Sequence, residues 1–374
     1  MNELARYSIQ AIAFAVIAVF VISRSRKTDL YQFSLILVWL VGVIAIYARY
    51  GEGQVLFYSN DQEIHQLIVV NYIDFFGISL GSTINFRYII TLPVYLISKL
   101  GFNEILLFKY LQLFALIGIY SESKKILMSN AVSLRLWHAL FIASPVMIFF
   151  STLALRDVIL AYFVLFVVFR KRVDHQAIAA GAIFLLKPHL AVALIVGLLS
   201  ARVFMMIGGR LKIFSGGILV FVMYIFGAYA YSLGTIVRNG FNPGASDLIF
   251  SQQRISQVAL NFTGLQFLSQ LSEGENIVAF SLGQLLAARL LLFDSLVIPA
   301  TFAVITVFAL RKLEVEAIHT LSSFVFFLGL VTQTDFNSTR QNLPFYALMG
   351  IICVANLSRP AAKPNPELKA TRVG

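Results

Sequence analysis

The stretch YSIQAIAFAVIAVFVISRSRK, residues 7–27, joins a long apolar run without charged side chains to three basic residues. A helix of about 20 apolar residues matches the hydrocarbon core of a bilayer, which is about 30 Å thick. Arg24, Arg26 and Lys27 at its end are typical of the cytoplasmic boundary of a membrane span. The run lacks the basic leader and the small-residue cleavage site of a signal peptide, so we expect it to be retained as a transmembrane helix.

Similar apolar runs recur along the whole chain, which is 59% hydrophobic and 13% charged. We therefore expect an all-α, polytopic integral membrane protein with about 11 transmembrane helices, several of them short or broken. The predicted spans are residues 7–23, 31–48, 105–120, 136–154, 158–169, 177–186, 190–205, 214–232, 292–310, 320–333 and 343–357.

The basic residues, which bring the net charge to +11, form short clusters between these runs. No basic face interleaved with aromatic residues is present, so nucleic acid is not an expected partner. We interpret the clusters as cytoplasmic topology markers, which puts the N-terminus outside and the C-terminus in the cytoplasm. They are Arg24/Arg26/Lys27, Lys124/Lys125/Arg135, Arg170/Lys171/Arg172, Arg202/Arg210/Lys212, Arg311/Lys312 and the tail with Arg359, Lys363, Lys369 and Arg372.

This topology predicts one transmembrane domain, residues 1–357, followed by a disordered cytoplasmic tail, residues 358–374. Two large outer loops, about 49–104 and 233–291, are long enough to carry chemistry. Within the first loop, residues 88–100 are too short and too polar to cross a bilayer, so we expect this segment to lie along the outer interface. The single cysteine, Cys353, offers no disulfide framework and no cysteine metal site.

Several predicted spans are too short to cross the hydrocarbon core. Only 12 residues separate Asp157 from Arg170, and Pro188 interrupts the sequence LLKPHLA to give two half-length helices. The turn at residues 332–344 joins two further short spans. Their outer ends should be recessed, and each carries a cation: Arg156, Lys187 with His189, and Arg340. Ionisable groups at membrane depth often mark a functional path, so three recessed cations suggest an anion site.

Each cation also has a purely structural interpretation. Arg156 could pair with Asp157, which would itself cap the helix start. Lys187 could extend outward to water. His189 could be a hydrogen-bonded packing residue, and Arg340 an ordinary boundary residue.

The first outer loop concentrates acids in YSNDQEIHQ, residues 58–66, between apolar and aromatic neighbours. A carboxylate against such neighbours has a raised pKa, which suits a general base, so Asp61 and Glu63 are candidate catalytic residues. A solvated loop is the structural alternative. A divalent cation at Asp61, Glu63 and His65 is a weaker one, because no second cluster completes the site. The mixed charges of the second loop include Arg254, which we add to the candidate substrate-binding residues.

These features resemble the bacterial polysaccharide polymerases of Wzy or EpsG type and, more distantly, the C-type glycosyltransferase fold. The resemblance lies in FYSNDQEIH, LGFNEILLFKYLQLFALIGIYSESKK, SPVMIFFSTLALRD, FLLKPHLA and STRQNLP, in that order. The separated pair Asp61 and Glu63, in place of adjacent acids, and the extra N-terminal span depart from the family pattern. The resemblance implies that Asp61 is the catalytic base and that Arg156, Lys187 and Arg340 hold the lipid pyrophosphate.

The expected function is polymerisation of polyprenyl-pyrophosphate-linked oligosaccharide repeats on the outer face of the bacterial inner membrane. Undecaprenyl-pyrophosphate-linked oligosaccharide would be both donor and acceptor, and a Wzz-type chain-length regulator is a possible partner. No metal and no other cofactor is expected. A single-sugar transferase and a lipid-linked saccharide flippase are the alternatives, although a flippase usually shows internal symmetry that this sequence lacks.

Overall fold

The computed structural model describes residues 3–24, 29–51, 87–138, 145–153, 155–170, 172–206, 218–230, 297–331 and 339–358. The regular elements in these ranges are all helices. Four are long and apolar enough to cross a membrane: α1 (Glu3–Ser23), α2 (Leu30–Tyr50), α6 (Glu104–Ser129) and α11 (Pro188–Met206). These helices support the prediction of a multi-pass membrane protein.

Further helices lie in the described ranges. They are α5 (Arg87–Ser98), α8 (Pro145–Ser151), α9 (Asp157–Phe169), α10 (Val173–Leu186), the helices Ile218–Ala230 and Val297–Ala309, α16 (Glu314–Val331) and α17 (Thr339–Leu357). The helix Val297–Ala309 ends in a π-helical turn, η4 (Ile305–Ala309). The short helix α5 lies where an interfacial helix was predicted.

Ten of the eleven predicted spans coincide with helices, and the span at 136–154 does not. Its described part contains α8, which has 7 residues and extends only about 10 Å. Residues 152–153 then leave the helix, and residues 139–144 lie outside the described ranges. The prediction of one continuous helix to residue 154 was therefore wrong, because hydrophobicity alone does not show where a buried apolar segment turns.

Two helix lengths also differ from the prediction. α6 continues to Ser129, nine residues beyond the predicted end, because its last turns remain packed against other helices. α10 is short, with 14 residues, but α11 has 19 and is a full-length candidate span. Pro188 therefore separates one short helix from one long helix, not two half-length helices.

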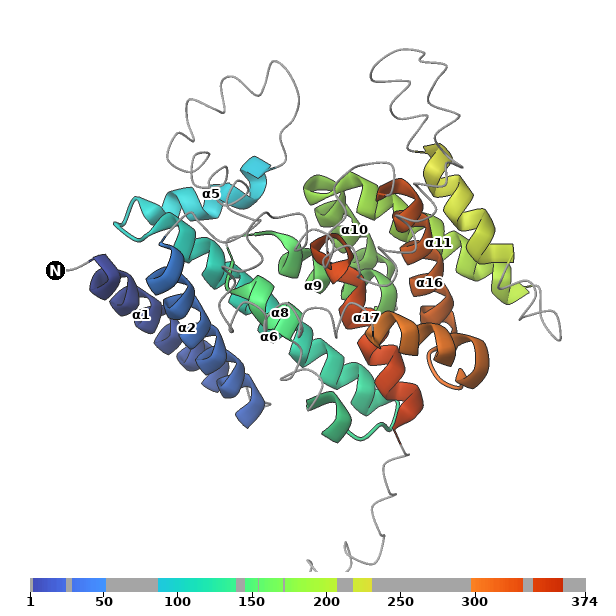
Figure 1. The fold of residues 1–374 in the computed structure, drawn as a ribbon, viewed down its shortest axis with the longest axis horizontal. Helices are drawn as coiled ribbons and strands as arrows, with labels where there is room; N and C mark the ends of the chain where they lie inside the picture. The colour runs from blue at the N-terminus through green and yellow to red at the C-terminus, as the bar shows by residue number, and fades with distance from the viewer. Residues whose placement is uncertain are drawn as a thin grey trace, which may run out of the picture.

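The helices form two connected groups (Figure 1). α1, α2, α5 and α6 share one apolar core, in which the rings of Tyr7 and Tyr47 stack with centroids 3.7 Å apart. The second group surrounds α9, which packs against α6, α10 and α17, while α11 packs along α16. α6 belongs to both groups, so it joins them.

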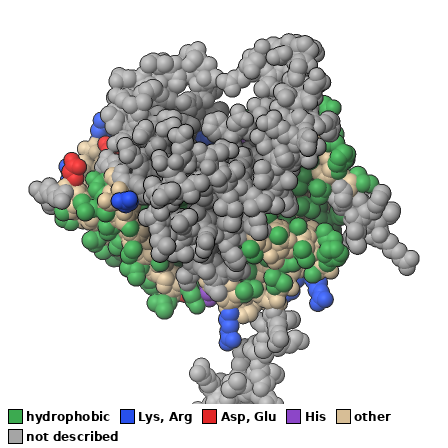
Figure 2. All heavy atoms as spheres, viewed as in Figure 1, with side chains coloured by type: hydrophobic (Ala, Val, Ile, Leu, Met, Phe, Trp, Pro, Cys, Tyr) green, Lys and Arg blue, Asp and Glu red, His purple; other side chains and the backbone are tan. Residues whose placement is uncertain are grey.

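Three contacts bring predicted cytoplasmic segments to the same end of the molecule. Asp29 follows the first basic cluster in the sequence, and its Oδ2 lies 2.5 Å from Lys124 Nζ. Arg170 binds Glu122 at 2.6 Å, and Lys312 Nζ donates to the carbonyl of Asn130. We call this the basic end. Figure 2 shows hydrophobic side chains over the flanks, Lys and Arg side chains at the lower edge, and both basic and acidic side chains at the upper left. Which compartment the basic end faces stays a prediction.

Two glycines allow unusually close contact between the helix Ile218–Ala230 and α16. A Cβ added at Gly227 would lie 2.2 Å from the carbonyl oxygen of Phe326, and one at Gly329 would lie 2.4 Å from that of Tyr224. Small residues at such crossings are typical of membrane helices, where lipid tails are as apolar as the side chains and close packing supplies the attraction.

Residues 151 and 152, which precede α9, contact the middle of α2. Trp39 Nε1 donates to the carbonyl of Ser151 at 3.0 Å, and a Cβ on Gly42 would touch Thr152. α2 continues for eight residues beyond Gly42, about 12 Å, away from the basic end. The segment that leads into α9 therefore packs against the middle of α2 and not against its far end. That this segment is recessed in the membrane, as the short span at 158–169 suggests, stays a prediction.

Candidate functional site

The candidate site begins at the break between α10 and α11. Lys187, with φ −156° and ψ 79°, ends α10, and Pro188 begins α11. The N–H of Lys187 donates to Ile183 at 2.7 Å, while its carbonyl accepts from Leu190 and Ala191. Lys187 thus provides backbone hydrogen-bond partners both at the end of α10 and at the start of α11. Pro188 has no N–H group that needs a partner.

The side chain of Lys187 is enclosed by the protein. It is only 4% exposed, and its Nζ lies 5.1 Å from the centroid of the Phe327 ring on α16. The ring of His189 stacks on Phe327 as well, at a centroid distance of 5.8 Å. The structural alternative in which Lys187 extends outward to water is therefore wrong, because its head group is held against an aromatic face inside the bundle.

Arg156 lies against the same break. It is the N-cap residue of α9, and its Nη1 donates at 2.5 Å to the carbonyl of Leu186, the last residue of α10. Carbonyls at a helix end lack partners within the helix, so this bond satisfies one of them. The N-cap is Arg156 itself and not Asp157, which is the first helical residue and only 2% exposed.

The start of α17 approaches the same ring. Phe345 lies with its centroid 5.5 Å from that of Phe327, and Arg340 is in the first turn of the same helix. Arg340 was predicted in a connecting turn, but α17 already begins at Thr339, and Pro344 is accommodated within it. The structure describes the backbone of Arg340 but not its side chain.

The break and the starts of α9 and α17 lie away from the basic end, because both helices have their C-terminal ends there. The C-terminus of α9 reaches Glu122 through Arg170. The C-terminal part of α17 carries Asn356, whose side-chain oxygen accepts from the backbone N–H groups of Arg311 and Lys312. The N-terminal ends of α9 and α17 therefore both lie away from the basic end. This arrangement brings Arg156, Lys187 and the backbone of Arg340 to one region.

The remaining predicted site residues, Asp61, Glu63 and Arg254, lie outside the described ranges. Their roles stay predictions. The described ranges contain no group of three His, Cys, Asp or Glu side chains that could hold a metal ion.

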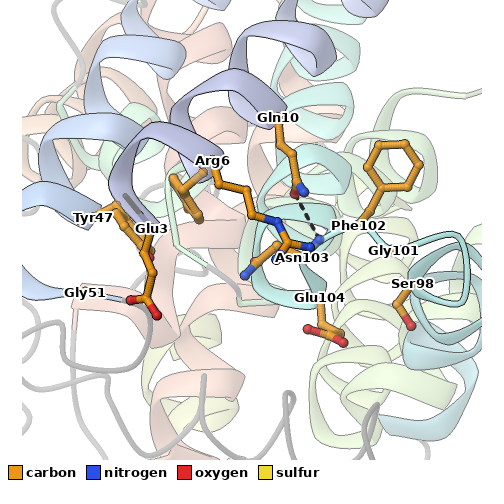
Figure 3. Close-up of a pocket in the computed structure, with 11 residues that line it drawn as sticks. Glu3, Arg6, Gln10, Tyr47, Gly51, Ser98, Gly101, Phe102, Asn103 and Glu104 are labelled. Carbon is orange, nitrogen blue, oxygen red and sulfur yellow. Dashed lines mark hydrogen bonds between the residues drawn. The ribbon is translucent and has the colours of Figure 1, made fainter. Parts of the chain in front are cut away.

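A second polar region was missed by the sequence analysis. Lys109 is fully buried in α6, and its Nζ donates to Tyr7 Oη at 3.1 Å. Tyr7 and Tyr47 line a cavity of about 620 Å³ between α1, α2, α5 and α6 (Figure 3). The available signal was a lysine inside the apolar run at 105–120, since a charge at that depth is costly without a partner.

Comparison with protein families, with curated proteins and with solved structures finds no match to this chain.

Proposed function

We propose that this protein is a membrane glycosyltransferase that polymerises polyprenyl-pyrophosphate-linked oligosaccharide repeats at the outer face of the inner membrane. The observation that supports it most is the contact of Arg156 with the carbonyl of Leu186, directly beside the enclosed Lys187. One cation from the start of α9 and one from the end of α10 thus lie at the same break between helices.

Such a region suits a pyrophosphate leaving group for electrostatic reasons. Charge–charge attraction is stronger where water is excluded, and an Arg fork binds phosphate oxygens in a directed geometry. The first turn of α9 adds the partial positive charge of a helix N-terminus. Groups arranged in this way stabilise the negative charge that develops as the glycosidic bond to the pyrophosphate breaks.

The other components of the proposal come from the predicted roles. Asp61 would remove the proton from the attacking hydroxyl of the acceptor, with Glu63 beside it. Arg340, Arg254 and His189 would complete the binding of the lipid-linked donor. Undecaprenyl-pyrophosphate-linked oligosaccharide would serve as donor and acceptor, with a chain-length regulator as a further partner.

The experiment measures products from purified protein supplied with a lipid-linked oligosaccharide. A ladder of repeats indicates a polymerase, one added sugar a single-sugar transferase, and translocation without a new bond a flippase. We expect a ladder. Translocation alone would contradict an enzymatic role.

Variants at the break test the proposed pyrophosphate contact. Arg156→Gln and Lys187→Gln should each slow transfer about 30- to 1000-fold, corresponding to a loss of about 2 to 4 kcal/mol of transition-state stabilisation. Arg172→Gln is the matched control, because Arg172 is exposed and pairs with Asp174, two residues away in the chain. Folded Arg156→Gln and Lys187→Gln proteins with control-level turnover and donor binding would rule out this role.

A further inference from the structure

The cavity between α1, α2, α5 and α6 is separate from the break at Lys187. It is lined from four elements, and its volume of about 620 Å³ is within the range of small-molecule sites. It lies at the end of α6 that points away from the basic end, since its lining includes Asn103 and Glu104 at the start of that helix.

The polar lining offers both donors and acceptors to a ligand. Arg6 can only donate, while the carboxylates of Glu3 and Glu104 accept. None of these three forms an ion pair with another residue in the part of the chain that the structure describes. Figure 3 shows the side chains of Glu3, Arg6 and Glu104 gathered in the same lining.

Gln10 is oriented by a backbone contact. Its side-chain oxygen accepts from the N–H of Asn103 at 3.0 Å, which leaves its NH₂ group as a donor (Figure 3). The side-chain oxygen of Asn103 in turn caps α6 by accepting from Leu106 at 2.8 Å. The amide groups of the lining are therefore held in place before a ligand binds.

Aromatic rings supply an apolar surface beside these polar groups. Tyr47 is held flat against Tyr7, with an angle of 13° between the ring planes, and Phe102 lines the cavity as well. Lys109 fixes Tyr7 by donating a hydrogen bond to its hydroxyl oxygen. An aromatic residue presents an apolar face together with a polar edge, which suits a ligand of mixed character.

From this lining we propose that the cavity binds a neutral sugar unit. A pyranose has an apolar C–H face that matches Tyr47 or Phe102, and a rim of hydroxyls that both donate and accept. Glu3, Glu104 and Arg6 carry opposite charges in one lining, which favours a polyhydroxylated ligand over a strongly anionic one. The inference rests on the lining residues, and the proposed pyrophosphate contact is not required for it.

The test is saturation-transfer NMR on the full chain in a detergent without a sugar headgroup. The probes are the methyl glycosides of glucose, galactose, mannose, rhamnose and N-acetylglucosamine. We expect transfer to at least one of them. Glu104→Gln and Tyr47→Leu should weaken its apparent affinity by about tenfold or more, as expected for the loss of a charged acceptor or of a packing surface.

Matched controls decide between this cavity and other surfaces. Arg172→Gln, at the basic end, should bind the sugar as the wild type does, and so should Lys187→Gln. Absence of transfer from all five sugars, or equal transfer in every variant, would overturn the proposal. Displacement of the sugar by inorganic pyrophosphate would do so too, because it would show an anion site. Loss of turnover in Lys187→Gln with sugar binding retained would separate the two sites.

Discussion

The guanidinium of Arg156 donates a hydrogen bond of 2.5 Å to the carbonyl of Leu186, 30 residues later in the chain. The bond connects the start of α9 to the end of α10 and places Arg156 beside Lys187. The same contact has a structural effect, because it satisfies a helix-end carbonyl, and a functional one, because it fixes a cation at the break.

A double mutant tests the structural alternative in which Arg156 serves as the partner of Asp157. On that alternative, Arg156→Ala lowers the melting temperature because the buried Asp157 loses its partner, and Arg156→Ala with Asp157→Ala recovers folding and turnover. We expect turnover to stay low in the double mutant, since the cation for the leaving group is still missing. Melting and turnover are measured on the same detergent-solubilised samples, and recovery of turnover would contradict the role of Arg156.

The predicted base, Asp61, is tested by a change of basicity at nearly constant shape. Asp61→Asn should abolish formation of the glycosidic bond and leave the protein level unchanged. Glu63→Gln should have a milder effect, because alternate residues of an extended chain point to opposite sides. Polymer of normal length and amount in cells with only Asp61→Asn would exclude Asp61 as the base.

The crossing of the helix Ile218–Ala230 with α16 predicts a loss of stability without a change in charge. Gly227→Ala and Gly329→Ala should each destabilise the protein by about 1 to 3 kcal/mol, because the new methyl group overlaps a backbone carbonyl. Gly181→Ala in α10 is the matched control, since nothing lies within 4 Å of its added Cβ. Thermal melting in detergent provides the measurement, and equal melting temperatures for all three variants would disprove the close crossing.

The start of α2 predicts a dependence of stability on pH. Burial alone would raise the pKa of Asp29, but hydrogen bonds from Lys124, Tyr120 and the Gln32 backbone outweigh it, so the pKa is lowered from 3.8. A lowered pKa stabilises the folded state above the unfolded value of 3.8 and loses this effect as the pH falls through the folded pKa.

Asp29→Asn isolates that charge, because asparagine also caps helices well. It should cost about 0.5 to 1 kcal/mol at neutral pH, and the difference from wild type should shrink as the pH falls through the lowered folded pKa. Asp29→Ala should cost more, since it removes the cap as well. A pH-independent difference between Asp29→Asn and wild type would show that the carboxylate is not stabilised by these contacts.

Cysteine labelling tests the orientation of the two ends. Single cysteines replacing the exposed residues Lys99 and Lys125 in a Cys353→Ala background report on opposite ends of α6. We expect Lys99→Cys to react with an impermeant thiol reagent applied to intact cells, and Lys125→Cys to react only after lysis. The reverse pattern would invert the topology and move the proposed site to the cytoplasmic side.

The sequence by itself determined the helical membrane class and nearly all the helix positions, because lipid requires long uncharged helices and charge marks their ends. Runs such as residues 7–23 therefore predict a helix without knowledge of their neighbours. The basic clusters similarly predicted that Lys124, Arg170 and Lys312 would share one end, and the contacts around them agree.

Only the tertiary structure decided the lengths and the partners of these helices. Hydrophobicity does not show that α8 ends near Trp39, that Leu186 accepts from Arg156, or that Lys187 faces Phe327. The sequence could not predict the cavity that Tyr7 and Tyr47 line either, since Tyr7, Tyr47 and Asn103 come from three separated segments. Such contacts depend on which helices pack side by side, and in a membrane that choice follows from close side-chain fit, because apolar composition is alike on every helix.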